Sequence, residues 1–216
     1  LRELSDRAVG QGVSVIFGFV LEEDGARYNA AACLTADGQI YLYKKSHLNQ
    51  EELLWARPGD QAGICVDLPH ARVGILLGDE AMIPEVPRLL ANYGCDILAI
   101  PAAQERLCAP CLGAQNRENP FFWHIARVRA NENNVYAVFS SQVDGSGIFG
   151  PDMFLDPRYE TICAGEEMAV LEVDTDFILR DGQTRYSVNV AREKPMLSTR
   201  HTIWYDPLLE KTEVDV

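Results

Sequence analysis

The 216-residue sequence has no apolar run that approaches the length of a membrane span, about 18 residues. Its first residues show no secretory signal pattern. Basic residues are few: 19 Lys and Arg stand against 32 Asp and Glu, for a formal net charge of −13. A surface for nucleic acid or an anionic membrane needs a basic stripe, so we expect neither partner. These absences favour a cytoplasmic protein.

Motifs for cofactors and metals are also scarce. The "GSG" at 145–147 is too short for a phosphate-binding loop and lacks the following Lys. A single C-x-x-C, Cys108 to Cys111, has no second Cys/His pair to complete a zinc site. We therefore expect no cofactor and no metal, and keep a redox or metal protein using Cys108 and Cys111 as an alternative. The other cysteines in apolar surroundings, Cys33, Cys65 and Cys95, are predicted core residues.

Strand and helix patterns alternate along the chain. Residues 13–20 form a continuous apolar run that predicts a buried strand, and residues 28–45 predict two strands joined at Asp37–Gly38. A second pair of strands is expected at 63–68 and 71–77, further strands at 95–101, 135–142, 147–157 and 168–175, and helices at 84–94 and 119–134. In the second helix, Phe121, Ile125 and Val128 have helical spacing. Strand pairs alternating with single helices favour two antiparallel sheets, each covered by helices on its outer face.

Two short segments have the residue types that catalysis uses. Lys45, His47, Glu51 and Glu52 follow a predicted strand, where a lysine beside a carboxylate suits electrostatic or proton-transfer work; a solvated loop is the alternative. The second segment joins the strand ending near Leu77 to the helix near Pro84. Many α/β enzymes keep a nucleophile at such a turn, but here it contains Gly78, Asp79 and Glu80. The two carboxylates could instead cap the helix.

Several motifs occur together in one order. They are an Asn after an aromatic (Tyr28–Asn29) before a hairpin, then "KSHL" at 45–48, "RPGD" at 57–60, the strand–turn–helix of 71–103, "RANEN" at 129–133, and "GIFGPD" at 147–152. Over about residues 4–176 this order resembles the nitrilase (carbon-nitrogen hydrolase) superfamily. The resemblance implies an α/β fold, a four-layer α–β–β–α sandwich, homodimers, and a Glu–Lys–Cys triad that attacks amides or nitriles.

The resemblance assigns expected roles to this chain's residues. Lys45 matches the triad lysine, Glu52 the supporting glutamate (with Glu51 as the alternative), and Gly78 the position of the nucleophile. Substrate-binding residues are expected at Asp79, Glu80 and Gln104, and the ligand is expected to be a small amide or nitrile-like molecule. The triad base is expected upstream of residue 1. We expect a hydrolase-like domain at 1–180, lacking its N-terminal strand–helix portion, and a C-terminal extension at 181–216. The extension is expected to be an oligomer arm, with a poorly ordered terminus as the alternative.

Glycine has no side chain that could attack a carbon atom. The sequence therefore predicts a carbon-nitrogen hydrolase domain with impaired catalysis. The alternative is an active amidase, either with a non-standard nucleophile such as Asp79 or Glu80 or as an engineered Cys-to-Gly form.

Overall fold

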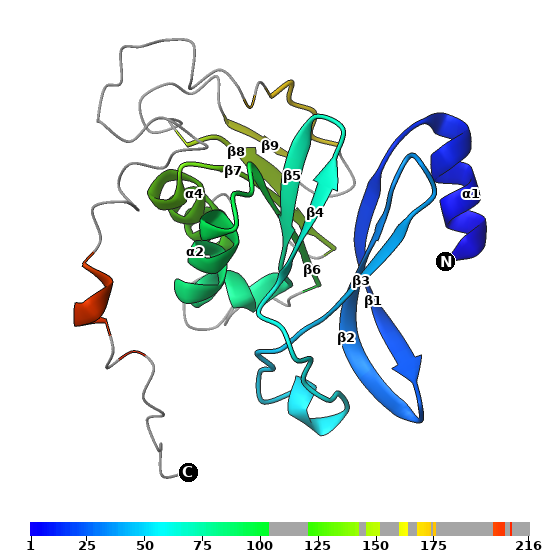
Figure 1. The fold of residues 1–216 in the computed structure, drawn as a ribbon, viewed down its shortest axis with the longest axis horizontal. Helices are drawn as coiled ribbons and strands as arrows, with labels where there is room; N and C mark the ends of the chain where they lie inside the picture. Colours follow the sequence, from blue (N-terminus) through cyan, green and yellow to red (C-terminus); the bar gives the residue numbers. More distant parts are fainter. Residues whose placement is uncertain are drawn as a thin grey trace, which may run out of the picture.

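A computed structural model describes residues 1–103, 121–142, 146–151, 160–163, 168–173, 175, 201–205 and 208, and its elements form four layers (Figure 1). Helix α1 (Arg2–Gln11) is the first layer. The second is a sheet of three strands: β1 (Val15–Glu23), β2 (Ala26–Leu34) and β3 (Ile40–Lys44). The third is a sheet of six strands: β4 (Ile64–Leu68), β5 (Ala71–Ile75), β6 (Ile97–Ala102), β7 (Tyr136–Ser141), β8 (Ser146–Phe149) and β9 (Glu160–Cys163). Helices α2 (Glu85–Asn92) and α4 (Phe121–Asn133) form the fourth.

Three apolar cores hold these layers together, which confirms the predicted α–β–β–α order. Ala8 of α1 packs on Ala32 and Leu34 of β2. The opposite face of the same sheet packs on the second sheet, through Ala31, Cys33, Tyr43, Val66, Val73, Ile75, Leu77 and Ala99. The largest core lies between the second sheet and α2 and α4, with Leu90, Leu98, Trp123 and Phe139 among its members. Residues of β2 thus alternate between two cores, as the period of a strand requires.

The second sheet is mixed, so the expectation of two antiparallel sheets is wrong for it. Strands β4 and β5 pair antiparallel, β5, β6 and β7 are parallel, and β7, β8 and β9 are antiparallel. The chain passes through α2 between β5 and β6, and through α4 between β6 and β7. Such helical crossovers return the chain to the same end of the sheet and make its strands parallel.

In two apolar segments, the side chains that are buried differ from those that the sequence predicted. Strand β1 is a half-buried edge strand and not a buried one; Val20 is 59% exposed. On α4, Val128 is exposed, whereas Phe122, Ala126, Ala130 and Asn133 are buried. The buried residues of α4 have the predicted helical spacing, but each lies one residue after its expected position. The covered face also includes the indole of Trp123 and the guanidinium of Arg129.

The last predicted strand is also misplaced. Residues 168–173 have no regular secondary structure, and β9 lies in the segment that was expected to connect two strands. Of the predicted C-terminal arm, the described residues include one short 3-10 helix, η4 (Thr202–Trp204), with exposed side chains. The other described residues of the arm are His201, Tyr205 and Leu208.

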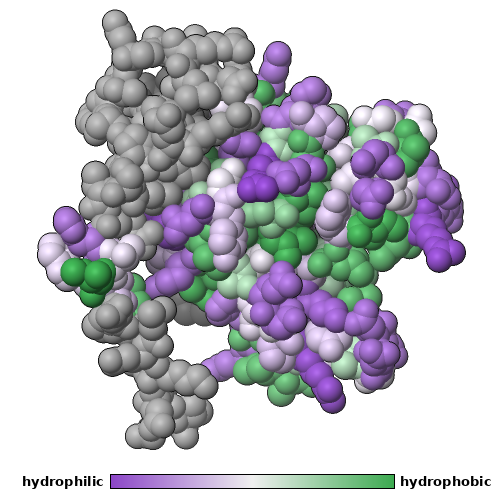
Figure 2. Space-filling model, in the orientation of Figure 1, coloured by the Kyte–Doolittle hydropathy of each residue, from purple (hydrophilic) through white to green (hydrophobic). Residues whose placement is uncertain are grey.

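Apolar side chains also reach the surface. Figure 2 shows an apolar patch at the lower edge of the molecule, where Figure 1 has the 3-10 helix η1 (Glu52–Leu54). In that helix Leu54 is 87% exposed. None of the helices in the described ranges has both the length and the apolar character needed to cross a membrane.

Candidate functional site

Lys45 directly follows β3, and two backbone hydrogen bonds fix its position. Its N–H donates to the carbonyl of Asn29, and its carbonyl accepts from the N–H of Gly59, both at 2.8 Å. Gly59 is needed there, since a Cβ on it would lie 2.1 Å from the carbonyl oxygen of Lys44. The "RPGD" segment therefore packs directly on the end of the strand that carries the lysine.

The Lys45 side chain is almost entirely buried and forms ion pairs with two carboxylates. Its Nζ donates to Oε1 and Oε2 of Glu52, at 2.7 and 2.6 Å, and to Oδ1 of Asp79. The side chains of Lys45, Glu52 and Asp79 are 2%, 12% and 19% exposed. A buried ammonium is stable only with such partners. The structure therefore brings together predicted residues from the two segments, Lys45 and Glu52 from one and Asp79 from the other.

Asparagines hold the two carboxylates in place. Asn29 Nδ2 donates to Glu52 Oε1 at 2.6 Å, and Asn49 Nδ2 donates to Asp79 Oδ2 at 3.0 Å. The backbone N–H of Asn49 donates to Glu52 Oε2, while its side-chain oxygen accepts from the N–H of Glu52. Glu51, the alternative to Glu52, is exposed. The start of η1 at Glu52 explains this choice, because the turn directs consecutive side chains to different sides.

Gly78 is buried in the turn between β5 and α2, as the first residue of the 3-10 helix η2 (Gly78–Met82). Its φ is +49°, in the left-handed region that favours glycine. Residues other than glycine are strained there. The turn follows the carboxyl end of a parallel strand, the usual place for sites in α/β sheets.

Glu80 lies in the same turn but is fully buried, and its carboxylate connects the two halves of the site. Oε2 accepts from the N–H of Leu77, just before Gly78. Oε1 accepts from the Tyr43 hydroxyl at 2.7 Å and from the N–H groups of Ser46 and His47, which follow Lys45. With no exposed surface, Glu80 fits a positioning role better than the predicted substrate-binding one.

Burial and the neighbouring charge affect Tyr43. Its ring is buried between the sheets, and burial, then the negative charge of Glu80, raises the pKa of the phenol well above its ordinary value. The hydroxyl therefore stays protonated and acts as a donor to Glu80. Sequence reasoning assigned no role to Tyr43, which looked like one more apolar strand residue.

Arg129 supports the turn from the other side. Its Nε donates to the carbonyl of Ala81 at 2.7 Å, and its Nη1 pairs with Glu132 at 2.6 Å. The side chain is 8% exposed. The guanidinium thereby connects α4 to the end of η2. This function of the "RANEN" motif was not predicted.

Comparisons with known proteins identify the family of the chain. Residues 1–177 match the model of the carbon-nitrogen hydrolase family. The chain belongs to this family. It is 29% identical over 178 residues to a nitrilase of Pyrococcus abyssi, covering 79% of this chain and 63% of the relative. It is also 29% identical over 171 residues to an (R)-stereoselective amidase of a Pseudomonas species, covering 76% of this chain and 58% of the relative. The chain thus spans less than two thirds of the length of these two relatives.

Solved carbon-nitrogen hydrolases share the fold. The structure from Helicobacter pylori G27 has a TM-score of 0.80 at 20% identity, covering 96% of this chain and 74% of that one. An amidase from a Nesterenkonia species has a TM-score of 0.56, also at 20% identity, covering 69% of this chain and 57% of that one. At these identities the likeness supports the fold alone.

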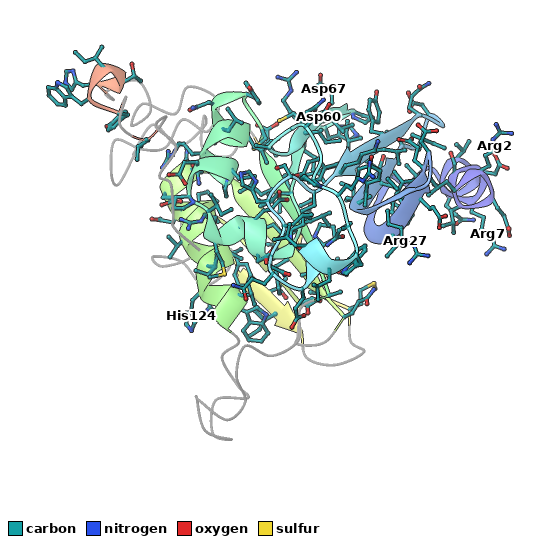
Figure 3. The ribbon with its side chains drawn as sticks, turned by 90° about the horizontal axis from the view of Figure 1, so that it is seen from below. Arg2, Arg7, Arg27, Asp60, Asp67 and His124 are labelled. Atoms are coloured by element: carbon teal, nitrogen blue, oxygen red, sulfur yellow. The ribbon has the colours of Figure 1, made fainter. Side chains whose placement is uncertain are left out.

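The remaining residues with chemically reactive or polar side chains that could be considered lie away from the site or outside the described ranges. Gln104, Cys108 and Cys111 are in the latter group. His124 projects from the outer side of α4 (Figure 3). Cys33 is a core residue, and burial raises the pKa of its thiol to about 11. In the part of the chain that the structure describes, no group of three or more His, Cys, Asp or Glu is arranged to hold a metal ion.

Proposed function

We propose that this carbon-nitrogen hydrolase domain binds a small amide or nitrile-like ligand without hydrolysing it. The observation that carries the proposal is Gly78, which occupies the turn where the family resemblance expects a cysteine. In this proposal Lys45 and Glu52 keep the places of the triad lysine and its supporting glutamate. Binding residues without a nucleophile make a degenerate enzyme, or pseudoenzyme.

The neighbouring carboxylates are poor substitutes for a thiolate. Covalent catalysis needs a nucleophile that can reach the ligand, and Glu80 is fully buried with both oxygens accepting hydrogen bonds. Asp79 is partly exposed, but its oxygens accept from Lys45 and Asn49, which lowers their nucleophilicity. The partial exposure of Asp79 beside Lys45 nevertheless makes it the candidate nucleophile in the rival proposal, an active amidase.

The partners and location in this proposal follow from the family and the composition. A small amide or nitrile is the ligand class named by the relatives, which include a nitrilase and an amidase. We place the domain in a homodimer in the cytoplasm. Sedimentation of the purified chain measures the first, and fractionation of the source cells measures the second.

Ammonia release tests the loss of hydrolysis. The full chain is incubated with a panel of short aliphatic amides and nitriles, beside D79N and K45M variants. The proposal expects no turnover above a buffer control for any of them. Turnover by the unchanged chain that disappears in D79N would establish the rival amidase with Asp79 as its nucleophile. Turnover that survives in D79N would also overturn the proposal. Calorimetric titration with butyramide tests the other half, and an absence of binding would refute it.

A further inference from the structure

Carboxylates of the protein enclose the ammonium of Lys45. Its Nζ contacts Oε1 and Oε2 of Glu52 and Oδ1 of Asp79, and the side chain is 2% exposed. Glu52 is fixed in this position by Asn29 and Asn49. A carbonyl or carboxylate oxygen of a ligand would therefore have to displace Asp79, the more exposed partner, to reach this lysine.

The charge balance of the cluster is negative. One ammonium faces two carboxylates, and Asp79 has the most exposed of the three side chains. A carboxylate offers about four lone pairs, and the bonds from Lys45 and Asn49 use two of those on Asp79. The accessible group therefore accepts hydrogen bonds and attracts positive charge.

We infer that Asp79 is a built-in ligand of Lys45 that determines the specificity of the site. It takes the place of a ligand's oxygen on the ammonium, and its remaining lone pairs receive a ligand's N–H group. The site then recognises the nitrogen end of its ligand, either an amide NH₂ or a protonated primary amine, and rejects carboxylates. This inference rests on the proposed function and names the part of the ligand that it contacts.

Three probes of equal length and different end groups test the inference: n-butylammonium, butyramide and butyrate. Each is titrated calorimetrically into the unchanged chain and into D79A at low salt. The unchanged chain should bind butylammonium and butyramide but not butyrate. D79A frees a donor of Lys45 and removes one negative charge, so butyrate should gain at least about tenfold in affinity while butylammonium loses about as much. The gain for butyrate should vanish in K45M/D79A.

Two further variants control for charge and folding. D6A removes an exposed carboxylate on α1, in the first layer, with the same change in net charge, and should keep the original order of affinities. D79N keeps a carbonyl acceptor for Lys45 without the charge, and should lose butylammonium without gaining butyrate. D79N also decides the question if D79A does not fold.

The inference would be overturned if butyrate bound the unchanged chain and D79A with equal affinity, or if butyrate bound neither of them. So would a D79N variant that binds butylammonium like the unchanged chain. These outcomes are distinct from a failure of the proposed function, which is detected as ammonia release from an amide or nitrile or as absent butyramide binding.

Discussion

The hydroxyl of Tyr43 donates a 2.7 Å hydrogen bond to the carboxylate of Glu80, and both groups are buried between the sheets. One residue comes from β3 and the other from the turn after β5, so this bond joins the lysine-bearing strand to the turn that contains Gly78. The contribution of this hydrogen bond to the free energy of unfolding can be measured by removing a single oxygen atom.

The variant Y43F keeps the ring and deletes that oxygen. A hydrogen bond to a charged group contributes about 1.5–3 kcal/mol, so Y43F should lower the free energy of unfolding by that amount. Y93F removes the hydroxyl of an exposed tyrosine and should change it by less than about 0.5 kcal/mol. Urea denaturation measures both. Equal effects of the two changes would mean that the bond to Glu80 adds nothing to stability.

The raised pKa of Tyr43 predicts a pH dependence of stability. A phenol whose pKa is higher in the folded than in the unfolded chain contributes stability that is complete below its unfolded pKa, about 10, and is lost as the pH rises through its folded value. The unchanged chain should therefore lose stability above about pH 10 more steeply than Y43F. Unfolding free energies at a series of alkaline pH values give the two slopes, and parallel slopes would contradict the assignment.

Adjacent lysines provide a matched pair for the ion-pair cluster. K45M leaves Glu52 and Asp79 as two unpaired carboxylates in a largely buried site, and breaking such a pair costs about 3–5 kcal/mol. K44M removes a surface ion pair with Glu23, which water and salt screen, so its effect should be much smaller. Thermal and urea unfolding compare the variants. Similar losses would show that burial of Lys45 does not govern its contribution.

Replacing Gly78 or Gly10 with alanine should change the stability of the protein in opposite directions. G78A places a side chain at a φ of +49°, which costs about 1–2 kcal/mol. G10A lies in α1, where an added Cβ meets nothing within 4 Å, and alanine there should stabilise by about 0.5–1 kcal/mol. Denaturant midpoints with unchanged slopes give both signs. A stable G78A would show that the turn relaxes to an ordinary backbone conformation.

Charged residues after an apolar strand and a family motif both indicated Lys45 and Glu52, and the structure places these two side chains in contact. The sequence could not separate Asp79 from Glu80. Both are acidic and adjacent, yet the tight turn of η2 directs Asp79 to Lys45 and Glu80 into the gap between the sheets. That difference depends on backbone dihedral angles and not on residue type.

The layer order was predicted correctly, while strand direction in the second sheet was not. Apolar periodicity identifies which segments are strands and helices, but direction depends on which strands become neighbours. The pairing of β6 with both β5 and β7 brings together residues that are widely separated along the chain. The same limit explains Arg129, whose carbonyl partner at Ala81 lies 48 positions away.

The bond from Arg129 to the carbonyl of Ala81 has a consequence for motion in the molecule. It makes the ordering of the 78–82 turn and the ordering of α4 a shared event, because the guanidinium keeps its partners in the two segments only when both segments are in place. Occupation of the site should therefore slow the exchange of amide hydrogens in the central turns of α4 with solvent deuterium. A helix on the outer layer would in this way report on ligand binding at the turn after β5.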